Sequence, residues 1–421
     1  MLFQSPRFLA AVAELGSLDL FCEALGCYFI YRIAVRSMLK ALTATKVFSM
    51  VIGVAAGFAF AEDTLADQID QNAKRPARSR SSTEMFAPSG LVVVLPPGGE
   101  KEQKELQAIN NPYINGVAVQ MNWHDIEPTE GQPDWSRLDE IFSAAESTNK
   151  WVQLLIFPGF FAPEWAKDGA QSDLFPIQYG PGAGRIERLP MPWDQRYLTR
   201  WFAFLKEVSA KYGQSRAFKM IAADGPTSVS AEMTLPNKPQ DHKKWLSHSY
   251  TVEKYIGAWQ QVFHVYATVF PNQCISLSGP GLPVLGSGRK DPGERMRAKL
   301  KIVAQASAIL GRRLVLQWSD LHAGRTHVEA PERDFVNSYS GRIITGFQMR
   351  CAAEGDSRAS RAMGAEGDPA LALRRSIDEG MQPNNRGQHV NYLEIYERDV
   401  IAEEMQPVLR YAGSLFQSNP R

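Results

Sequence analysis

The stretch INGVAVQMNWHDIEPTEGQPDWSRLDEIFSAAESTNKWVQLLIF, residues 114–157, decides the fold. It begins with a short apolar run at 114–121, continues with a segment of helical composition at 134–148, and ends with a second apolar run at 151–157. Short runs rich in β-branched residues, separated by a helical segment, are typical of parallel strands joined by a helix. The stretch therefore predicts a strand, a helix and a second strand.

The same alternation continues along the rest of the chain. Eight apolar strands alternating with helices match a (β/α)₈ TIM barrel, and residues 158–194 form one enlarged loop. A doubly wound open sheet is the alternative, but no Gly-rich phosphate fingerprint follows the first strand. No second domain is evident, so residues 89–421 are predicted to be the barrel domain. The expected strands are 91–97, 114–121, 151–157, 218–223, 274–279, 313–319, 342–349 and 390–396, and helical stretches include 252–270, 293–310, 368–380 and 398–415.

Residues 38–61 have the three parts of a signal peptide. Lys40 and Lys46 supply a basic region, residues 47–60 an apolar region, and residues 59–61 an A-x-A cleavage site. A membrane anchor is the alternative, but the apolar run is short for the roughly 20 residues that a spanning helix needs. The sequence therefore predicts a secreted or periplasmic protein without a membrane span after cleavage.

Two further segments flank this signal. Because a signal peptide is read at an N-terminus, Met38 is the expected start, and residues 1–37 are interpreted as an upstream extension. Residues 62–88 are polar and lack apolar periodicity, which predicts a flexible linker.

Composition excludes one class of partner. The chain has 46 Lys and Arg against 45 Asp and Glu, so a nucleic-acid partner is not expected. No Cys/His spacing resembles a zinc site, no cofactor is expected, and His322 and His327 are predicted to be surface residues. Export permits a disulfide between Cys274 and Cys351, but the sequence leaves their pairing open.

Carboxylates, amides and aromatic side chains cluster where the predicted strands end. Active sites of TIM barrels form at the C-terminal ends of the strands. Aromatic faces beside hydrogen-bonding groups suit sugar rings, whose faces are apolar and whose rims carry hydroxyl groups. Asp320 and Arg350 also follow strands, without an assigned role. The predicted substrate-binding residues are Asn122, Trp123, Phe157, Trp165, Asp224, Trp318, Gln348 and Tyr396.

At residues 114–165 the sequence resembles TIM-barrel glycoside hydrolases of the large clan that includes cellulase-like and β-galactosidase-like enzymes. The resemblance implies a glutamate acid/base after strand four and a glutamate nucleophile after strand seven. Glu127 of the motif precedes a Pro turn and is predicted to be structural. The residues that carry the resemblance are Trp123, Ile126-Glu127-Pro128, Gly131, Asp134-Trp135 and Leu138-Asp139.

The resemblance assigns Glu232, after the fourth strand, as the general acid/base. Glycoside cleavage needs one protonated carboxyl group and one ionised carboxylate. Ala231 precedes Glu232 where the clan often has Asn, and Gln348 ends strand seven where a glutamate is expected. Glu394 on strand eight is the predicted second acid because a strand holds it rigidly, and Glu354 in a loop is the alternative.

The sequence thus predicts an exported glycoside hydrolase that acts on an oligo- or polysaccharide, with retention as the expected outcome. A carboxyl separation of about 5 to 5.5 Å gives retention, and about 6.5 to 9.5 Å gives inversion. A glycan-binding barrel that has lost one catalytic acid and a barrel lyase are the alternatives. Sugar identity, linkage, endo or exo action and oligomeric state stay open.

Overall fold

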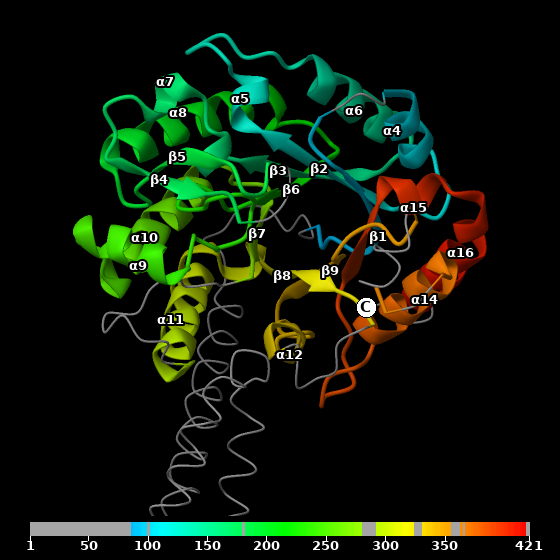
Figure 1. The fold of residues 1–421 in the computed structure, drawn as a ribbon. Helices are drawn as coiled ribbons and strands as arrows, with labels where there is room; N and C mark the ends of the chain where they lie inside the picture. The colour runs from blue at the N-terminus through cyan, green and yellow to red at the C-terminus, as the bar shows by residue number, and fades with distance from the viewer. Residues whose placement is uncertain are drawn as a thin grey trace, which may run out of the picture. The chain divides into compact units, whose positions relative to one another are not determined.

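Eight parallel strands pair into a closed barrel, in the order β1-β10-β9-β8-β7-β6-β3-β2 (Figure 1). The computed structural model describes residues 86–98, 102–178, 182–279, 292–323, 331–354, 363–364 and 367–417. The predicted extension, the signal peptide, all but the last residues of the linker, and His327 lie outside these ranges. The barrel strands are β1 Gly90–Leu95, β2 Gly116–Asn122, β3 Trp151–Phe157, β6 Phe218–Ala222, β7 Cys274–Ser278, β8 Leu314–Leu321, β9 Ile344–Met349 and β10 Tyr392–Tyr396.

The (β/α)₈ architecture predicted from the sequence is confirmed, because each of the eight apolar runs forms one barrel strand. Every residue of β1, β3 and β7 is buried. Strands buried on both faces read as continuous apolar runs, since side chains fill the interior and helices cover the outside. The open sheet considered from the sequence is excluded by the pairing of β1 with both β2 and β10.

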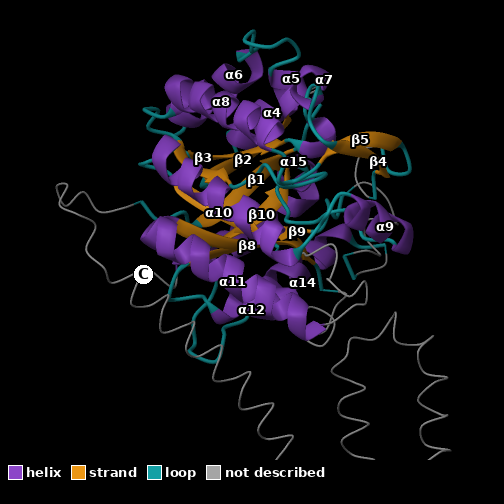
Figure 2. Cartoon of the chain, turned by 90° about the vertical axis from the view of Figure 1, so that its left-hand side faces the viewer, coloured by secondary structure: helices purple, strands orange, loops and turns teal. Residues whose placement is uncertain are grey.

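Helices surround the strands (Figure 2). Asp194 caps α8 by accepting the Tyr197 amide at 2.9 Å. The helical stretch predicted at 398–415 is divided, because Ala402 is extended between two helices. The longer helices are α4 Glu102–Ile109, α6 Ser136–Ser147, α8 Gln195–Tyr212, α9 Pro239–Ser247, α10 Val252–Val269, α11 Pro292–Leu310, α12 Pro331–Ser338, α14 Pro369–Gly380 and α16 Gln406–Gln417. The short ones are α5 Trp123–Ile126, α7 Glu164–Lys167, α15 Glu397–Ile401, η1 Gly159–Phe161, η2 Gly311–Arg313 and η3 Glu403–Met405.

The long loop predicted after the third strand contains secondary structure of its own. Strands β4 Ser172–Pro176 and β5 Ile186–Pro190 form an antiparallel ribbon within it. The ribbon is fixed to α9, because Phe175 stacks on Trp245 with 4.4 Å between ring centroids. His248 also lies 3.2 Å from the Asp173 carboxylate. The ribbon, which follows the C-terminal end of β3, is therefore held in place by α9.

The barrel interior is filled by large side chains that face glycines and by a polar layer above them. A Cβ on Gly346 would lie 2.1 Å from the Tyr392 ring, so only glycine leaves room for this tyrosine. The Tyr392 hydroxyl donates to Gln317 Oε1 at 2.8 Å. Gln153 Nε2 contacts the same Gln317 oxygen at 3.3 Å and Ser276 Oγ at 3.2 Å. These contacts show that Gln317 faces the barrel interior.

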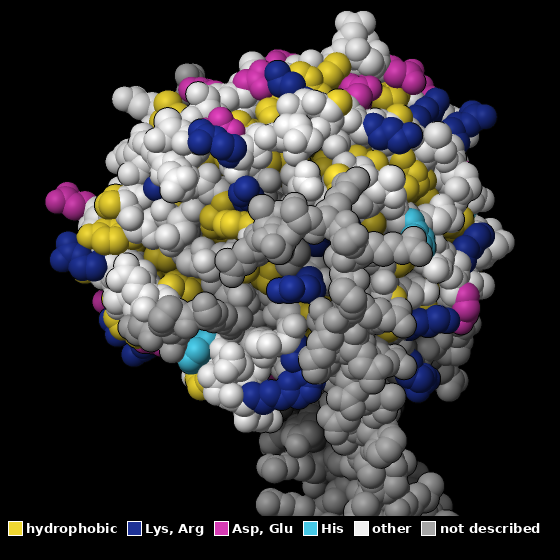
Figure 3. Space-filling model, turned by 180° about the vertical axis from the view of Figure 1, so that it is seen from behind, with side chains coloured by type: hydrophobic (Ala, Val, Ile, Leu, Met, Phe, Trp, Pro, Cys, Tyr) yellow, Lys and Arg dark blue, Asp and Glu magenta, His cyan; other side chains and the backbone are white. Residues whose placement is uncertain are grey.

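The surface, the helices and the cysteines add three findings. On the face drawn in Figure 3, Lys and Arg side chains are spread singly and in small groups among uncharged ones. Within the described residues, no helix has the length and hydropathy to cross a membrane. Cys274 and Cys351 are not joined in a disulfide, which answers the question of pairing that the sequence left open.

Candidate active site

The segment that follows β6 carries Glu232 to the C-terminal end of β7. Glu232 forms an isolated parallel bridge with Ser278, and the Met233 amide donates to the Ser278 carbonyl at 3.2 Å. The Ser228 hydroxyl donates to the Thr234 carbonyl at 2.7 Å and closes the loop. Glu232 therefore lies at the end of the barrel where TIM-barrel active sites form.

The surroundings of the Glu232 carboxyl group favour its protonated form. Burial raises its pKa to about 7, the charge of Asp320 acts in the same direction, and a hydrogen bond with Ser319 opposes them. The Ser319 hydroxyl also lies 2.9 Å from the Ser278 hydroxyl, which ties β7 to β8 beneath Glu232. A carboxyl group with such a pKa is still partly protonated at neutral pH, as a general acid requires.

Asp320 belongs to a charged group at the end of β8. Its Oδ1 lies 3.5 Å from Arg350 Nε, and about a third of its side chain is exposed. Arg350 Nη1 lies 3.2 Å from His322 Nε2, and the Arg350 amide donates to the Leu321 carbonyl at 3.0 Å. His322 is only 6% exposed, so its predicted surface position is wrong. Arg350 follows β9 and Asp320 lies at the end of β8, so their ion pair joins the ends of these two strands.

Glu394 occupies the barrel wall on β10 and is fully buried. Its Oε2 accepts a hydrogen bond from Gln317 Nε2 at 2.9 Å, whereas its Oε1 has no hydrogen-bond partner among the described residues. Burial raises its pKa to about 8, and the Gln317 hydrogen bond offsets only part of that effect. Glu394 is therefore protonated at neutral pH, and its carboxyl oxygens do not reach solvent.

Tyr396 connects the two glutamates predicted to be catalytic. The pKa of its phenol is raised first by burial and then by the charges of Glu394 and Glu232, so both carboxyl groups lie near the same hydroxyl. Gln348 is level with Glu394 in the pairing of β9 with β10. It is 5% exposed, and its Nε2 has no partner in the described part of the chain. Tyr396 thus lies near both predicted carboxyl groups, and Gln348 lies beside Glu394.

Two predicted aromatic contacts are nearly buried. Trp318 is 7% exposed and packs edge to face on Phe347 with 6.0 Å between ring centroids. Phe157 is 6% exposed at the end of β3, level with Asn122 on β2. Little of either ring is left for a sugar to cover.

The motif tryptophan, Trp123, is buried in an aromatic cluster behind β2. Its ring packs at 5.1 Å on Trp201 and stacks at 5.3 Å on Phe204. Its Nε1 donates to Glu127 Oε2 at 2.9 Å, and Glu127 Oε1 accepts the Gly131 amide at 2.8 Å. Both contacts agree with the structural role predicted for Glu127. The predicted contact between Trp123 and the sugar is not supported, because Trp123 has no exposed surface.

Trp165 and Asn122 keep part of their surface exposed. Trp165 Nε1 donates to the Glu127 carbonyl at 3.1 Å, which fixes the indole at the edge of the aromatic cluster. Asn122 Nδ2 donates to Asp125 Oδ2 at 2.8 Å. Of the predicted binding residues on the first half of the barrel, these two remain open to a ligand.

Asp224, predicted to bind substrate, is fully buried against the helices. Trp201 Nε1 donates to its backbone carbonyl at 2.9 Å, and its amide donates to the Tyr266 hydroxyl at 3.0 Å. Burial raises the pKa of its carboxyl group well above the usual range, and Thr227 offsets this only in part. The prediction is not supported, because Asp224 packs against side chains of α8 and α10.

Glu354, the alternative second acid, lies in the loop after β9. Its amide donates to Asp399 Oδ1 at 2.7 Å, and its carboxylate lies 3.8 Å from Arg398 Nε. These contacts attach it to α15, whereas the groups that shift the Glu232 pKa lie on β8.

Sequence reasoning noted Asp320 and Arg350 at strand ends but gave them no role. Ser319 was missed. The apolar run at 313–319 locates β8, but it does not tell which side chains near the end of this strand face the barrel interior. That information depends on pairing register, which a single sequence does not contain.

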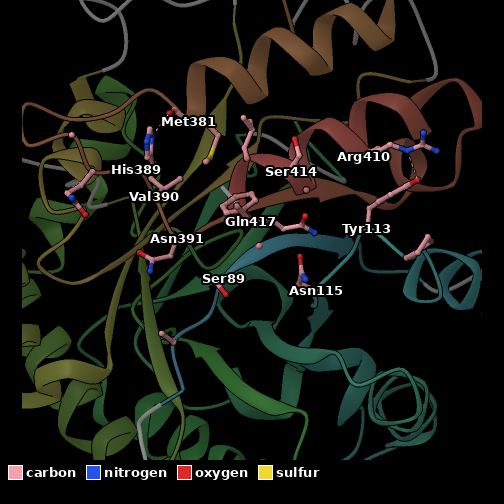
Figure 4. A pocket seen from close by; sticks show the side chains of 18 residues that line it. Ser89, Tyr113, Asn115, Met381, His389, Val390, Asn391, Arg410, Ser414 and Gln417 are labelled. Atoms are coloured by element: carbon pink, nitrogen blue, oxygen red, sulfur yellow. Dashed lines mark hydrogen bonds between the residues drawn. The ribbon is translucent and has the colours of Figure 1, made fainter. Parts of the chain in front are cut away.

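A cavity of about 830 Å³ lies at the opposite end of the barrel (Figure 4). It is lined by residues at the starts of β1, β2 and β10 and by α16, among them Asn115, Asn391, Arg410 and Gln417. The Tyr113 hydroxyl accepts a hydrogen bond from Arg410 Nε at 2.9 Å across one side. Because the N-terminal end of such barrels serves stability, Glu232 defines the candidate active site and this cavity does not.

Residues 98–269 match the model of glycoside hydrolase family 42, described as β-galactosidase. The matched region contains Glu232 and the aromatic cluster, and it ends before Asp320 and Glu394. No curated protein matches the chain. The fold and this match confirm the class that the sequence resembles: TIM-barrel glycoside hydrolases of the clan with cellulase-like and β-galactosidase-like members.

The solved structures that match the chain share little sequence with it. An exo-β-1,4-mannosidase from Opitutaceae bacterium strain TAV5 is 12% identical with a TM-score of 0.44, covering 81% of this chain and 63% of its own. A β-galactosidase from the haloarchaeon Halorubrum lacusprofundi is 12% identical with a TM-score of 0.47, covering 78% and 58%. The family 42 β-galactosidase Gan42B from G. stearothermophilus is 11% identical with a TM-score of 0.46, covering 77% and 56%. The chain thus spans about three fifths of the length of these proteins.

Proposed function

We propose that the chain is an exported glycoside hydrolase that cleaves O-glycosidic bonds of an oligo- or polysaccharide with two carboxyl groups. The observation that carries this proposal is the Glu232 carboxyl group, whose pKa is raised to about 7 at the C-terminal end of the barrel. It also lies inside the region that matches a glycoside hydrolase family. A carboxyl group that keeps its proton near neutrality can protonate the oxygen that leaves the sugar.

The reaction needs a second, ionised carboxylate on the other side of the anomeric carbon. Glu394 is the residue that the sequence prediction selects for this role, and its charge acts on Tyr396, as the charge of Glu232 does. Retention follows the clan that the chain resembles. Export follows from the predicted signal peptide at 38–61. Because the matching family is described as β-galactosidase, β-galactosides are the first substrates to test.

The proposal is tested with purified protein, a panel of aryl glycosides and oligosaccharides, and the Glu232→Gln variant. General acid catalysis contributes about 10²–10⁴-fold, so the variant should lose that much turnover on substrates with poor leaving groups. It should lose much less on dinitrophenyl glycosides, because their leaving group needs no proton. Glu404→Gln, which removes an exposed carboxylate near α16, is the matched control and should retain full activity.

The alternatives give different results in the same assay. A glycan-binding barrel would retain oligosaccharides on a column but release no sugar, with or without Glu232. Ala231 and Gln348 are the residues that favour this alternative. A lyase would release an unsaturated sugar that absorbs in the ultraviolet. Turnover that does not change in Glu232→Gln would contradict the proposed role of this residue.

A further inference from the structure

The proposed two-carboxylate reaction needs an ionised group that can touch the anomeric carbon. Glu394 meets neither requirement in this structure, because its side chain is fully buried and burial raises its pKa to about 8. Its contacts with Gln317 also place it in the polar layer that fills the barrel. The second acid should therefore be a partly exposed carboxylate near Glu232.

Strand β8 contains an irregularity at the required place. Trp318 pairs with Phe347 and Leu321 with Met349, so β8 advances three residues where β9 advances two. One extra residue in a strand forms a β-bulge, which changes the direction of the side chains around it. Bulges of this kind occur next to active sites, where they re-aim a side chain.

The direction of the bulged residues follows from their neighbours. Gln317 faces the interior, so the next residue, Trp318, faces outward. Leu321 also faces outward, because its Cδ2 would lie 2.6 Å from a Cβ on Gly380 of α14. Ser319 and Asp320 are the two residues between the outward-facing Trp318 and Leu321. The bulge therefore leaves both Ser319 and Asp320 on the inner side of the strand end.

The neighbours of Asp320 complete the argument. Glu232 bridges to Ser278, whose hydroxyl lies 2.9 Å from that of Ser319, the residue before Asp320. Ser319 also hydrogen-bonds Glu232, and the charge of Asp320 acts on the same carboxyl group, so Asp320 lies near Glu232 at the barrel mouth. Arg350 lies 3.5 Å from Asp320 on the side of β9. About a third of the Asp320 side chain is exposed, in contrast to Glu394.

We propose that Asp320, turned inward by the bulge in β8, is the second catalytic carboxylate and attacks the anomeric carbon. This inference rests on the proposed glycosidase function and concerns the same site. Arg350 is a positioning residue that holds Asp320 by their ion pair. Glu394 is a protonated structural acid that binds Gln317 and supports the wall of the site.

The reaction balances with these groups alone. An Asp320 carboxylate oxygen forms a bond to the anomeric carbon while the bond from that carbon to the leaving oxygen breaks and Glu232 gives its proton to the leaving oxygen. Water then attacks the anomeric carbon of the glycosyl ester and gives its proton to Glu232, and Asp320 leaves as a carboxylate. The products are the sugar with retained configuration and the released alcohol.

The experiment is covalent trapping of the wild-type protein with a 2-deoxy-2-fluoro glycosyl fluoride of a sugar it hydrolyses, followed by tryptic peptide mapping. The label is expected on the peptide 314–325, whose only side-chain carboxylate is Asp320. Label on peptide 387–398, which contains Glu394, or on peptide 351–358, which contains Glu354, would overturn the inference.

Variants give a second readout that does not need an adduct to accumulate. Asp320→Asn should lose at least about 10³-fold in kcat. Asp320→Gly with added azide should form a glycosyl azide of inverted configuration. Glu394→Gln should retain kcat within about tenfold. If Asp320→Asn stays active and Glu394→Gln does not, Asp320 is not the nucleophile.

These results separate the inference from the proposed function. A wild-type protein that hydrolyses no glycoside contradicts the function itself. Hydrolysis that is lost in Glu232→Gln but retained in Asp320→Asn contradicts only the role of Asp320. Circular dichroism and thermal unfolding of each variant confirm that the lost activity is not lost folding.

Discussion

At the N-terminal end of the barrel, Asn115 accepts the Leu91 amide and Asn391 accepts the Thr345 amide, each at 3.0 Å. At the C-terminal end, Glu232 and Glu394 are carboxyl groups whose pKa values are raised by burial. The first pair of side chains satisfies backbone groups where strands begin. The second pair costs folding free energy, because burial disfavours the charged form. Polar residues at the N-terminal end therefore serve stability, whereas Glu232 at the C-terminal end is placed to supply the proposed acid.

The largest effect expected from this difference is on the pH dependence of turnover. The Glu232 carboxyl group must be protonated to act as the acid, and that form is present below its pKa of about 7 and is lost above it. The value of kcat/KM should approach a tenfold fall per pH unit above this pKa, and so should fall about 50-fold between pH 7 and pH 9. Initial rates over pH 5 to 9 measure it.

Neighbouring groups provide the control for this profile. Asp320 and Ser319 act on the Glu232 carboxyl group, and the hydrogen bond from Ser319 lowers its pKa. Ser319→Ala should therefore move the basic limb to higher pH. A limb that moves to lower pH, or a rate independent of pH, would show that Glu232 does not control the profile.

The next largest effect is on the free energy of unfolding in Glu394→Gln. The Glu394 pKa is about 8 in the folded state and near 4.5 in the unfolded chain. Between these values the unfolded state loses the proton while the folded state retains it, so wild-type stability falls as pH rises. The variant lacks this contribution and should be more stable than wild type at pH 8, by at most about 5 kcal/mol.

Urea unfolding at pH 4 and pH 8 provides the measurement. The stability difference between variant and wild type should grow with pH, since the other buried acids contribute equally to both proteins. An equal difference at the two pH values would show that Glu394 is ionised in the folded protein. That outcome would restore Glu394 as a candidate nucleophile.

A smaller effect is expected at the other end of the barrel. Asn391→Ala leaves the buried Thr345 amide without its acceptor, which should cost about 1–3 kcal/mol of stability. Because Asn391 lies at the start of β10, kcat and KM should stay at wild-type values. Thermal unfolding and initial rates test both halves. A tenfold loss of kcat in a folded Asn391→Ala protein would break the separation between the two ends.

Particular residues show how far the sequence alone could go. Apolar runs predicted all eight strands, because a strand covered on both faces has little polar sequence. The Pro/Gly-rich loop after β6 placed Glu232 near its observed position. The inward position of Asp320 was not predicted, because a bulge depends on pairing between strands distant in sequence. Glu394 was predicted to be the second acid because a strand would hold it, and it does lie on β10. The apolar strand indicated burial of Glu394, but the sequence does not tell whether the barrel interior beside it is open to water.

The smallest effect concerns the cysteines, which also lie at opposite ends of the barrel. Cys274 begins β7 and is buried, which raises its thiol pKa to about 12, whereas Cys351 follows β9 and is partly exposed. A thiolate is the reactive form, so iodoacetamide should modify Cys351 in the native protein and Cys274 only after unfolding. Because no disulfide joins Cys274 to Cys351, a reducing agent should leave the melting temperature unchanged. Peptide mapping after labelling distinguishes the two cysteines, and a Cys274–Cys351 disulfide peptide would contradict the arrangement described.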